Sequence, residues 1–366
     1  MSNLIYLSPV PWVSFAQRPH KFVSWFHEKY GARVLWIEPY ATRLPRFADL
    51  QRIGGNQSLP TAAVTPDWLT VVSPESLPIE PIPGSGMVNR VLWRKTLTQA
   101  VQFEQDAGTV LVIGKPSILA IQLMKALPQC KSVYDAMDDF PAFYSGFSKW
   151  AMKRTEENIV LLADELWASS THLRERWSNK HNNVRLIYNG LDADVVKLSG
   201  SMPATADQMI FGYLGTVGNW FDWELIFALS KTVPNDIIRI IGPIYKPAPK
   251  PLPKNIETLP PRAHAEAMVA MAQFDVGLIP FLQNELTQSV DPIKYYEYRA
   301  LGMPVISSSF GEMCYRDERD GVYLVSDIAV LKNTVLCASK EVKPKRLDAS
   351  FINENSWASR FDHTSL

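Results

Sequence analysis

The stretch Asp291-Pro-Ile-Lys-Tyr-Tyr-Glu-Tyr-Arg-Ala-Leu-Gly-Met-Pro-Val-Ile-Ser307 contains a helix start, a helix end and the first residues of a buried strand. Asp291 is a good N-cap residue, and Pro292 suits the first position of a helix. Gly302 and Pro304 end the helix before a β-type run. The pattern predicts a short helix that leads into a buried strand.

The start of this helix is a candidate anion site. A helix start offers unpaired N–H groups and a partial positive charge, and Lys294 adds a full charge in the first turn. Glu297 lies one turn further along, where its carboxylate can accept hydrogen bonds from two neighbouring hydroxyl groups such as those of a ribose. The same residues fit an ordinary capped helix with a Lys–Glu surface pair equally well.

Length and charge narrow the class of protein. A chain of 366 residues suits two domains, and 46% apolar with 20% charged residues is ordinary for a globular protein. Lys plus Arg and Asp plus Glu both count 37, so no net field attracts nucleic acid, and no nucleic-acid partner is expected. The cysteines are odd in number and far apart, which indicates neither a disulfide framework nor a zinc site: Cys130, Cys314 and Cys337.

The sequence also bears on location. The apolar run Asn3–Leu7 is too short for the core of a signal peptide, and no apolar run approaches the length of a membrane span. We expect a cytoplasmic protein, or one peripheral on the cytoplasmic face of the inner membrane. A helix predicted over residues 87–105 carries basic residues beside Trp93, so it either lies on an anionic bilayer or, as we favour, packs with a solvated face.

Strand and helix patterns alternate along the chain and predict an α/β fold. The predicted strands are 4–7, 34–37, 68–72, 109–113, 131–134, 165–168 and 184–187, then 209–214, 237–241, 276–279, 305–309 and 322–325. The region 40–83 is rich in Pro, Gly and Ser and is predicted to be an insertion, and the Pro-rich stretch 247–261 to be an extended loop.

The loop after the first strand is a candidate cleft lining. It lacks Gly-x-Gly-x-x-Gly, which disfavours dinucleotide binding, but strand-end loops of open α/β sheets face the ligand crevice. Arg18 can instead form a salt bridge from loop to helix, and His20 can cap the helix start, predicted at Lys21. The candidates are Trp12, Gln17, Arg18 and His20.

Asp138 and Asp139 follow the predicted strand 131–134, at the edge where such a sheet presents its active site. One carboxyl group can have its pKa raised by the other and act as a base towards an acceptor hydroxyl. The alternatives are a doubly capped helix start and a buried Asp that holds loop amides.

Several elements of the second half resemble, in order, the donor-site signature of GT-B glycosyltransferases. The chain is similar to bacterial family-4-like enzymes (glycosyl transferases group 1) of exopolysaccharide and teichuronic-acid assembly. The resemblance implies two Rossmann-like domains with parallel sheets that face a cleft. The matching elements are Asp275–Phe281, Asp291–Lys294, Tyr296–Tyr298, Ala300–Gly302 and Pro304–Val305.

The resemblance also implies domain boundaries. Residues 1–191 would form the acceptor-binding domain, 192–207 a hinge, and 208–343 the domain that binds the nucleotide-sugar donor. Residues 344–366 would form a C-terminal helical tail that crosses back to pack on the first domain.

The resemblance implies most of the donor site. Many retaining relatives place a Glu eight positions before Glu297, where this sequence has Ser289, and relatives carry an Arg and a Lys after the glycine loop that are missing here. The expected donor contacts are Gly215, Thr216, Gly242, Ser289, Val290, Asp291, Pro292, Ile293, Lys294 and Glu297. The expected catalytic residues are Asp138, Asp139 and Lys294.

The activity implied is transfer of a sugar from a UDP- or GDP-sugar to a saccharide or lipid-linked saccharide. Lys294 and the helix start would stabilise the departing diphosphate. No Asp-x-Asp pair is suitably placed, so we expect no metal ion and no cofactor besides the nucleotide-sugar co-substrate. Two alternatives stay open: a sugar-nucleotide 2-epimerase of the same fold, and a catalytically inactive GT-B subunit that binds glycan or a partner.

Overall fold

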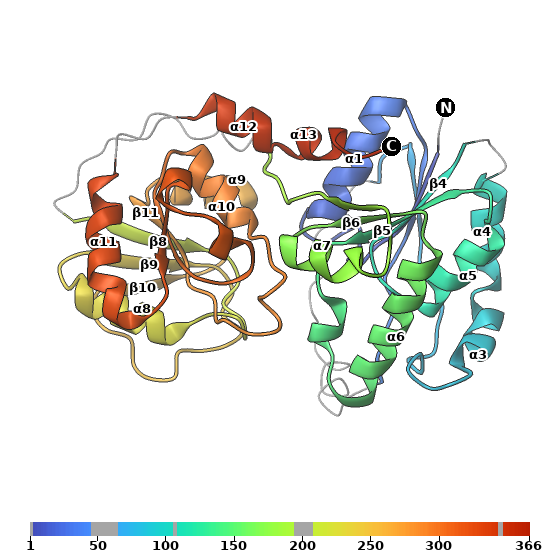
Figure 1. Ribbon diagram of the computed structural model, residues 1–366, viewed down its shortest axis with the longest axis horizontal. Helices are drawn as coiled ribbons and strands as arrows, with labels where there is room; N and C mark the ends of the chain where they lie inside the picture. Colours follow the sequence, from blue (N-terminus) through green and yellow to red (C-terminus); the bar gives the residue numbers. More distant parts are fainter. Residues whose placement is uncertain (1–2, 45–64, 105–107, 194–207, 343–346) are drawn as a thin grey trace. The chain divides into compact units, whose positions relative to one another are not determined.

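Short aliphatic and aromatic runs form two separate parallel sheets, because strands covered on both faces need apolar residues at successive positions. The structure, a computed structural model, describes residues 3–44, 65–104, 108–193, 208–342 and 347–366. The chain divides into two compact units, Met1–Ile187 and Tyr188–Leu366, and each holds one of the sheets (Figure 1).

In the described part of unit 1, seven parallel strands lie in the order β3-β2-β1-β4-β5-β6-β7. Their bounds are β1 Leu4–Leu7, β2 Val34–Ile37, β3 Leu69–Val72, β4 Val110–Ile113, β5 Lys131–Ala136, β6 Glu165–Ala168 and β7 Val184–Leu186. The strand order reverses between β1 and β4. In open α/β sheets, ligands bind at the carboxyl ends of the strands that flank such a reversal.

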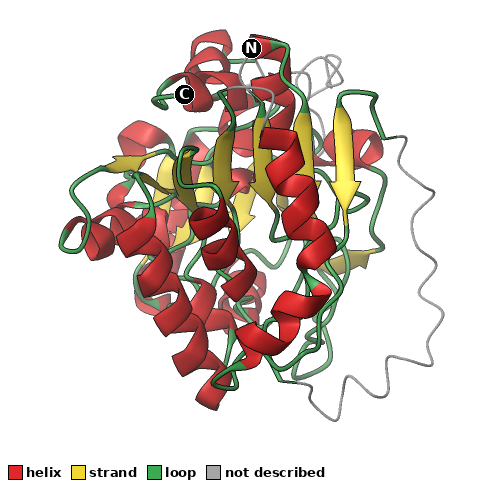
Figure 2. Cartoon of the chain, turned by 90° about the vertical axis from the view of Figure 1, so that its right-hand side faces the viewer, coloured by secondary structure: helices red, strands yellow, loops and turns green. Residues whose placement is uncertain are grey.

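Helices cover both faces of this sheet, as the helices alongside the strands in Figure 2 illustrate. Alternate residues of β1 serve the two faces: Ile5 and Leu7 pack with apolar side chains of α4, α5, α6 and α7, while Tyr6 packs against Phe22 of α1. The helical bounds are α1 Arg18–Tyr30, α3 Ser85–Leu92, α4 Arg94–Glu104, α5 Ile118–Ala126, η1 Phe140–Phe143, α6 Gly146–Leu162 and α7 Thr171–Ser178.

Over the residues of unit 2 that the structure describes, six parallel strands lie in the order β10-β9-β8-β11-β12-β13, and the order reverses between β8 and β11. The strands are β8 Ile210–Leu214, β9 Ile237–Ile241, β10 Ile256–Leu259, β11 Val276–Ile279, β12 Val305–Ser308 and β13 Val322–Val325. The helices are α8 Trp223–Thr232, α9 His264–Met271, α10 Ile293–Ala300, η3 Gly311–Tyr315, η4 Glu318–Asp320, η5 Ile328–Val330, α11 Leu331–Lys340, α12 Ala349–Asn355 and α13 Trp357–Asp362.

The α/β fold with two parallel sheets is confirmed, and two local predictions were wrong. The predicted helix 87–105 is two helices, α3 and α4, which separate at Trp93, the C-cap residue of α3. The predicted loop 247–261 contains the edge strand β10. The strand predicted at 68–72, within the predicted insertion 40–83, is confirmed as β3, which pairs with β2 at the edge of the sheet. Residues 45–64 of that region lie outside the described residues.

The ends of unit 2 are joined by hydrogen bonds. The amide N–H of Leu191 donates to the carbonyl of Asn355 (3.0 Å), and α12 packs on α10 through a ring contact between Phe351 and Tyr295. Residues 194–207 of the predicted hinge lie outside the described residues. The predicted domain boundaries and the predicted packing of the tail on the first domain stay predictions.

Candidate active site

Lys294 and Gly215 meet where the strand order of unit 2 reverses. Gly215 directly follows β8 with φ +145°, and Lys294 is the second residue of α10. A Cβ atom on Gly215 would lie 2.5 Å from Cε of Lys294, so only the bare Cα leaves room for the lysine. The ammonium lies 5.4 Å from the ring centroid of Tyr213 and 5.9 Å from that of Phe281. These contacts hold a positive charge beside the carboxyl end of β8.

The charges of Lys294 and Glu297 are only partly solvated. Both side chains are half-buried. Burial lowers the pKa of Lys294, which the Glu297 carboxylate opposes. Burial likewise raises the pKa of Glu297, which the Lys294 ammonium opposes. An anion that enters this corner would interact with an ammonium whose field is only weakly screened by water.

Two glycine turns complete this corner. Gly242 has φ +139°, and a Cβ atom on it would lie 2.3 Å from the carbonyl oxygen of Gly215. The hydroxyl of Tyr213 donates to the carbonyl of Thr216 (2.7 Å), which fixes the turn after β8. The structure therefore brings together four predicted donor contacts, Gly215, Thr216, Gly242 and Lys294.

Asp291 holds the start of α10 in place but does not cap it. The N-cap residue is Pro292, without a side-chain cap, so the predicted role of Asp291 was wrong. Its carboxylate accepts hydrogen bonds from the Asn189 amide N–H (2.8 Å), the Tyr296 hydroxyl (2.9 Å) and the Arg316 guanidinium (2.8 Å). The buried guanidinium offers a charge-assisted bond, which is stronger than a bond to a helix amide. The charge of Asp291 is thus already compensated.

Ser289 presents a buried hydroxyl near the start of α10. It is 1% exposed, and its Oγ has no hydrogen-bond partner among the described residues. The carbonyl of the neighbouring Val290 accepts from the amide N–H of Glu312 (3.0 Å), and a Cβ atom on Gly311 would lie 2.3 Å from that carbonyl. Glu312, in η3, is itself buried.

Arg18, in the first turn of α1, is buried against Asp135 of β5. Its Nε lies 3.1 and 3.0 Å from the two carboxylate oxygens, and Nη2 lies 2.9 Å from Oδ1. A further donor, Nη1, bonds the carbonyl of Ile187 (2.8 Å). Arg18 therefore forms a salt bridge, but it joins helix α1 to strand β5 and not a loop to a helix as predicted.

The other cleft candidates lie around the start of α1. Gln17 is the N-cap and is exposed, and its amide N–H donates to Nδ1 of His20 (3.2 Å). His20 is buried with its Nε2 3.1 Å from the carbonyl of Trp12, and burial lowers the pKa of His20. The Trp12 ring packs edge-on against Trp36 at 5.2 Å. The helix-cap role of His20 is confirmed, and the helix starts at Arg18 instead of Lys21.

Asp138 and Asp139, just after β5, have different surroundings. Asp139 forms an ion pair with Arg176 (2.7 Å), which also contacts Glu156 (3.3 Å), and Glu156 accepts from the Tyr134 hydroxyl (2.7 Å). For the carboxyl of Asp138, the described residues provide no hydrogen bond or ion pair. Burial raises the pKa of Asp138 to about 7, with Arg18 opposing and Asp135 and Asp139 adding to the shift. Asp138 is therefore suited to exchange a proton near neutral pH.

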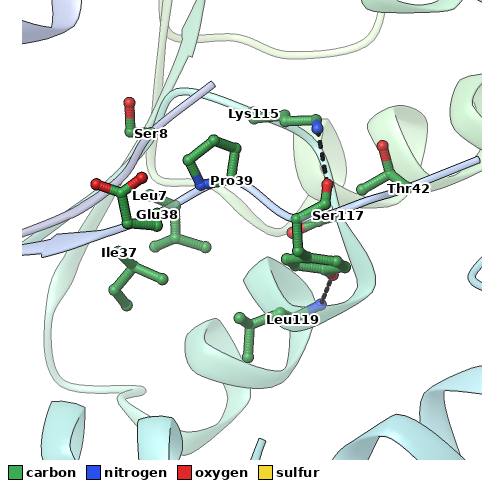
Figure 3. Close-up of a pocket in the computed structure, with 10 residues that line it drawn as sticks. Leu7, Ser8, Ile37, Glu38, Pro39, Thr42, Lys115, Ser117 and Leu119 are labelled. Carbon is green, nitrogen blue, oxygen red and sulfur yellow. Dashed lines mark hydrogen bonds between the residues drawn. The ribbon is translucent and has the colours of Figure 1, made fainter. Parts of the chain in front are cut away.

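Sequence reasoning missed a pocket at the carboxyl ends of β1, β2 and β4 (Figure 3). It is small and open to solvent, and Ser8, Glu38, Thr42 and Lys115 contribute polar groups. Nζ of Lys115 donates to the carbonyl of Tyr40 (3.1 Å), and burial lowers the pKa of Lys115. The sequence Gly114-Lys115-Pro116, directly after β4, could have indicated this pocket, because the carboxyl ends of strands in such sheets face ligands.

Within the part of the chain that the structure describes, no group of three or more His, Cys, Asp or Glu side chains is placed so that it could bind a metal ion. None of the described helices combines the length and the apolar character that a membrane crossing requires.

Comparison with known proteins points to one fold. No protein-family model matches the chain. Over 198 residues it is 22% identical to TuaH of Bacillus subtilis strain 168, whose assigned name, a teichuronic acid biosynthesis glycosyltransferase, is itself provisional. The match covers 48% of this chain and 50% of TuaH, so the chain spans about half the length of the curated relative that it matches.

Solved structures resemble the chain over nearly its whole length. Sucrose-phosphate synthase of Thermosynechococcus elongatus has a TM-score of 0.62 at 14% identity, covering 98% of this chain and 94% of that one. The lipopolysaccharide outer core galactosyltransferase WaaB has a TM-score of 0.61 at 12% identity, covering 99% and 98%. These likenesses show the fold: the chain has the GT-B fold with two Rossmann-like domains, as the sequence resemblance predicted.

Proposed function

We propose that this GT-B protein is a glycosyltransferase that moves a sugar from a nucleotide-sugar donor to a hydroxyl group of a saccharide or lipid-linked saccharide. The observation that carries the proposal is the contact of Lys294 with the bare turn at Gly215, at the strand reversal of unit 2. An ammonium and helix N–H groups beside a glycine turn suit the two phosphate groups of a nucleoside diphosphate. The names of TuaH, a teichuronic acid biosynthesis glycosyltransferase, and WaaB, a lipopolysaccharide outer core galactosyltransferase, support transfer in surface polysaccharide assembly.

Unit 2 would bind the donor. Lys294 stabilises the negative charge that develops on the diphosphate as the bond from the sugar to the phosphate breaks. Glu297, one turn along α10, accepts hydrogen bonds from the ribose hydroxyl groups. The Ser289 hydroxyl, which has no partner among the described residues, bonds a hydroxyl group of the donor sugar.

Unit 1 would bind the acceptor, with Asp138 as the base. The Asp138 carboxylate takes the proton of the acceptor hydroxyl, whose oxygen bonds the anomeric carbon. The bond from that carbon to the diphosphate breaks, and the diphosphate leaves with the electron pair. A direct displacement of this kind inverts the configuration of the sugar. A carboxyl with a pKa of about 7 accepts the proton more readily than an ordinary Asp.

Donor turnover tests the proposal. Release of nucleoside diphosphate from a panel of UDP- and GDP-sugars should depend on a saccharide acceptor, and Lys294→Met should lower kcat about 100-fold or more. Lys332→Met is the control, since Lys332 is exposed on α11. The proposal is contradicted if no donor is turned over, or if Lys294→Met and the control behave alike.

In this proposal Lys294 and the helix N–H groups stabilise the negative charge of the diphosphate, so no metal ion should be needed. A chelator should leave turnover unchanged, and a loss that Mg²⁺ restores would contradict this part. Product analysis without acceptor addresses the alternatives. Formation of an epimeric sugar nucleotide would identify an epimerase, and donor binding without turnover of any donor would identify a binding subunit.

A further inference from the structure

A row of aromatic side chains is exposed on η1 and the first half of α6. Phe143, Phe147 and Trp150 are 52%, 47% and 51% exposed, and their spacing of four and three residues places Phe147 and Trp150 on one face of the helix. The rings of Phe147 and Trp150 stack with centroids 5.4 Å apart and an angle of 17°. Apolar side chains gathered on a surface mark a contact with a partner or a membrane.

The same segment is positively charged. Residues 143–155 contain Lys149, Lys153 and Arg154 and no Asp or Glu. Lys153 and Arg154 are exposed, and the guanidinium of Arg154 lies 5.5 Å from the Trp150 ring. The acidic residues that follow already have cationic partners: Glu156 contacts Arg176, and Glu157 contacts Lys180.

Helix α3 and the first residue of α4 also combine exposed apolar and basic side chains. Met87 and Val91 are 77% and 76% exposed, Arg90 and Arg94 are exposed beside them, and residues 85–103 contain no Asp or Glu. Lys95 does not belong to this basic group, because it lines a surface pocket together with the acidic residue Glu75.

Helix α3 and the first turns of α6 lie at the same end of unit 1 (Figure 1). The carbonyl of Gly86 in α3 accepts from Gln122 of α5 (3.0 Å), and α6 begins directly after the loop and η1 that follow β5. Both helices therefore adjoin the carboxyl edge of the sheet. With Arg94 of α4 and Phe143 of η1, their exposed apolar and basic residues make up what we call the basic apolar face: Met87, Arg90, Val91, Arg94, Phe143, Phe147, Trp150, Lys153 and Arg154.

We propose that the basic apolar face docks on an anionic lipid bilayer. Its aromatic and aliphatic side chains enter the boundary between headgroups and acyl chains, while Arg and Lys bind lipid phosphates. Only a local patch can do this, since the chain as a whole carries no net charge. Docking itself is independent of the reaction. The further step, in which docking brings the carboxyl edge of unit 1 to a lipid-linked acceptor, rests on the proposed function.

Sedimentation of the full chain with vesicles tests the docking. We expect binding to vesicles of equal phosphatidylcholine and phosphatidylglycerol, and much weaker binding to phosphatidylcholine alone. Phe147→Ser with Trp150→Ser, and Met87→Ser with Val91→Ser, should each lower the partition coefficient about tenfold or more. Lys153→Glu with Arg154→Glu should remove the preference for the anionic vesicles.

The matched control is Leu336→Ser with Lys332→Glu, an exposed apolar and basic pair on α11 of unit 2, which should bind like the wild type. Thermal unfolding checks that every variant is folded. Equal binding to both vesicle types, no binding by the wild type, or unchanged binding by the serine variants would overturn the proposal. So would an aromatic variant that turns a dimer into a monomer in solution while vesicle binding stays the same, because the face would then join two copies of the chain.

Donor turnover with a water-soluble acceptor should be unchanged in all of these variants. The vesicle result is therefore separate from the outcome for the proposed function.

Discussion

Neighbouring residues of this chain differ sharply in the roles that their surroundings permit. The Asp139 carboxylate is engaged by Arg176, whereas burial raises the pKa of Asp138 to about 7 and the described residues leave its carboxyl without an ion-pair partner. A group kept available in this way suits proton transfer.

The pH dependence of turnover should report Asp138. We expect kcat/KM of the wild type to fall below about pH 7, because a protonated carboxyl cannot accept the acceptor proton. Asp138→Asn should lose about 100-fold or more and show no such acid limb. Asp139→Asn, the control, should keep the limb. Full activity in Asp138→Asn would exclude the base assignment.

The same carboxyl group should also affect stability. Its pKa in the folded protein is raised, so its favourable contribution is complete below the pKa of the unfolded chain and is lost as the pH rises through about 7. Asp138→Asn should therefore raise Tm more at pH 8 than at pH 4.

Ser289 gives a second test at the scale of one residue. Ser289→Ala should leave Tm unchanged or slightly higher, because its Oγ has no partner among the described residues. If the hydroxyl binds the donor sugar, kcat/KM should fall about tenfold, as expected for one lost hydrogen bond. Ser308→Ala is the control: its Oγ accepts from the Phe281 amide N–H (3.0 Å), so Tm should fall. Unchanged kinetics in Ser289→Ala would remove this contact from the site.

At the scale of elements, the start of α10 depends on a buried ion pair. Asp291 links α10 to Arg316 at the end of η3 and to Asn189 at the start of unit 2, and the guanidinium of Arg316 stacks on Tyr295 with its central carbon 3.9 Å from the ring centroid. Loss of either charged partner leaves the other buried and uncompensated.

Asp291→Ala should lower the free energy of unfolding by about 3 kcal/mol or more, as measured by urea denaturation. Arg316→Met should act in the same direction, and the double variant should lose less than the sum of the two. Arg319→Met breaks the exposed pair with Asp317 and should leave the unfolding midpoint unchanged. Equal effects of Asp291→Ala and Arg319→Met would contradict a structural role for the buried pair.

At the scale of the whole molecule, the sheets could be predicted because strands covered on both faces are continuous apolar runs. The predicted bounds of β1, β2, β9, β11 and β13 agree with the structure. The edge strand β10 was missed because its sequence, Ile256-Glu-Thr-Leu259, lies in a Pro-rich segment and its two central residues are polar. The break at Trp93 was missed because no Gly or Pro marks it.

Short sequence motifs identified Gly215 and Lys294 as candidate donor contacts. Ion pairs between residues far apart in the sequence could not be predicted from it. Arg18 pairs with Asp135, which is 117 residues away in the sequence, and Arg316 pairs with Asp291, which is 25 residues away. Only the fold brings these charges together in the interior. The helix cap expected of Asp291 failed for this reason, since local sequence cannot show a distant guanidinium.

The most direct test of the proposed donor site is calorimetric titration of UDP and GDP into the wild type and Gly215→Ala. A Cβ atom at residue 215 would lie 2.5 Å from Cε of Lys294, so the methyl group must displace the ammonium. Gly31→Ala is the matched control, because it also has a positive φ (+62°) but nothing lies within 4 Å of its added Cβ.

We expect the wild type and Gly31→Ala to bind one of the two nucleotides with equal affinity, and Gly215→Ala to bind it at least about tenfold more weakly. A wild type that binds neither nucleotide, or a Gly215→Ala variant that binds as tightly as the wild type, would show that the corner formed by Gly215 and Lys294 is not the diphosphate site.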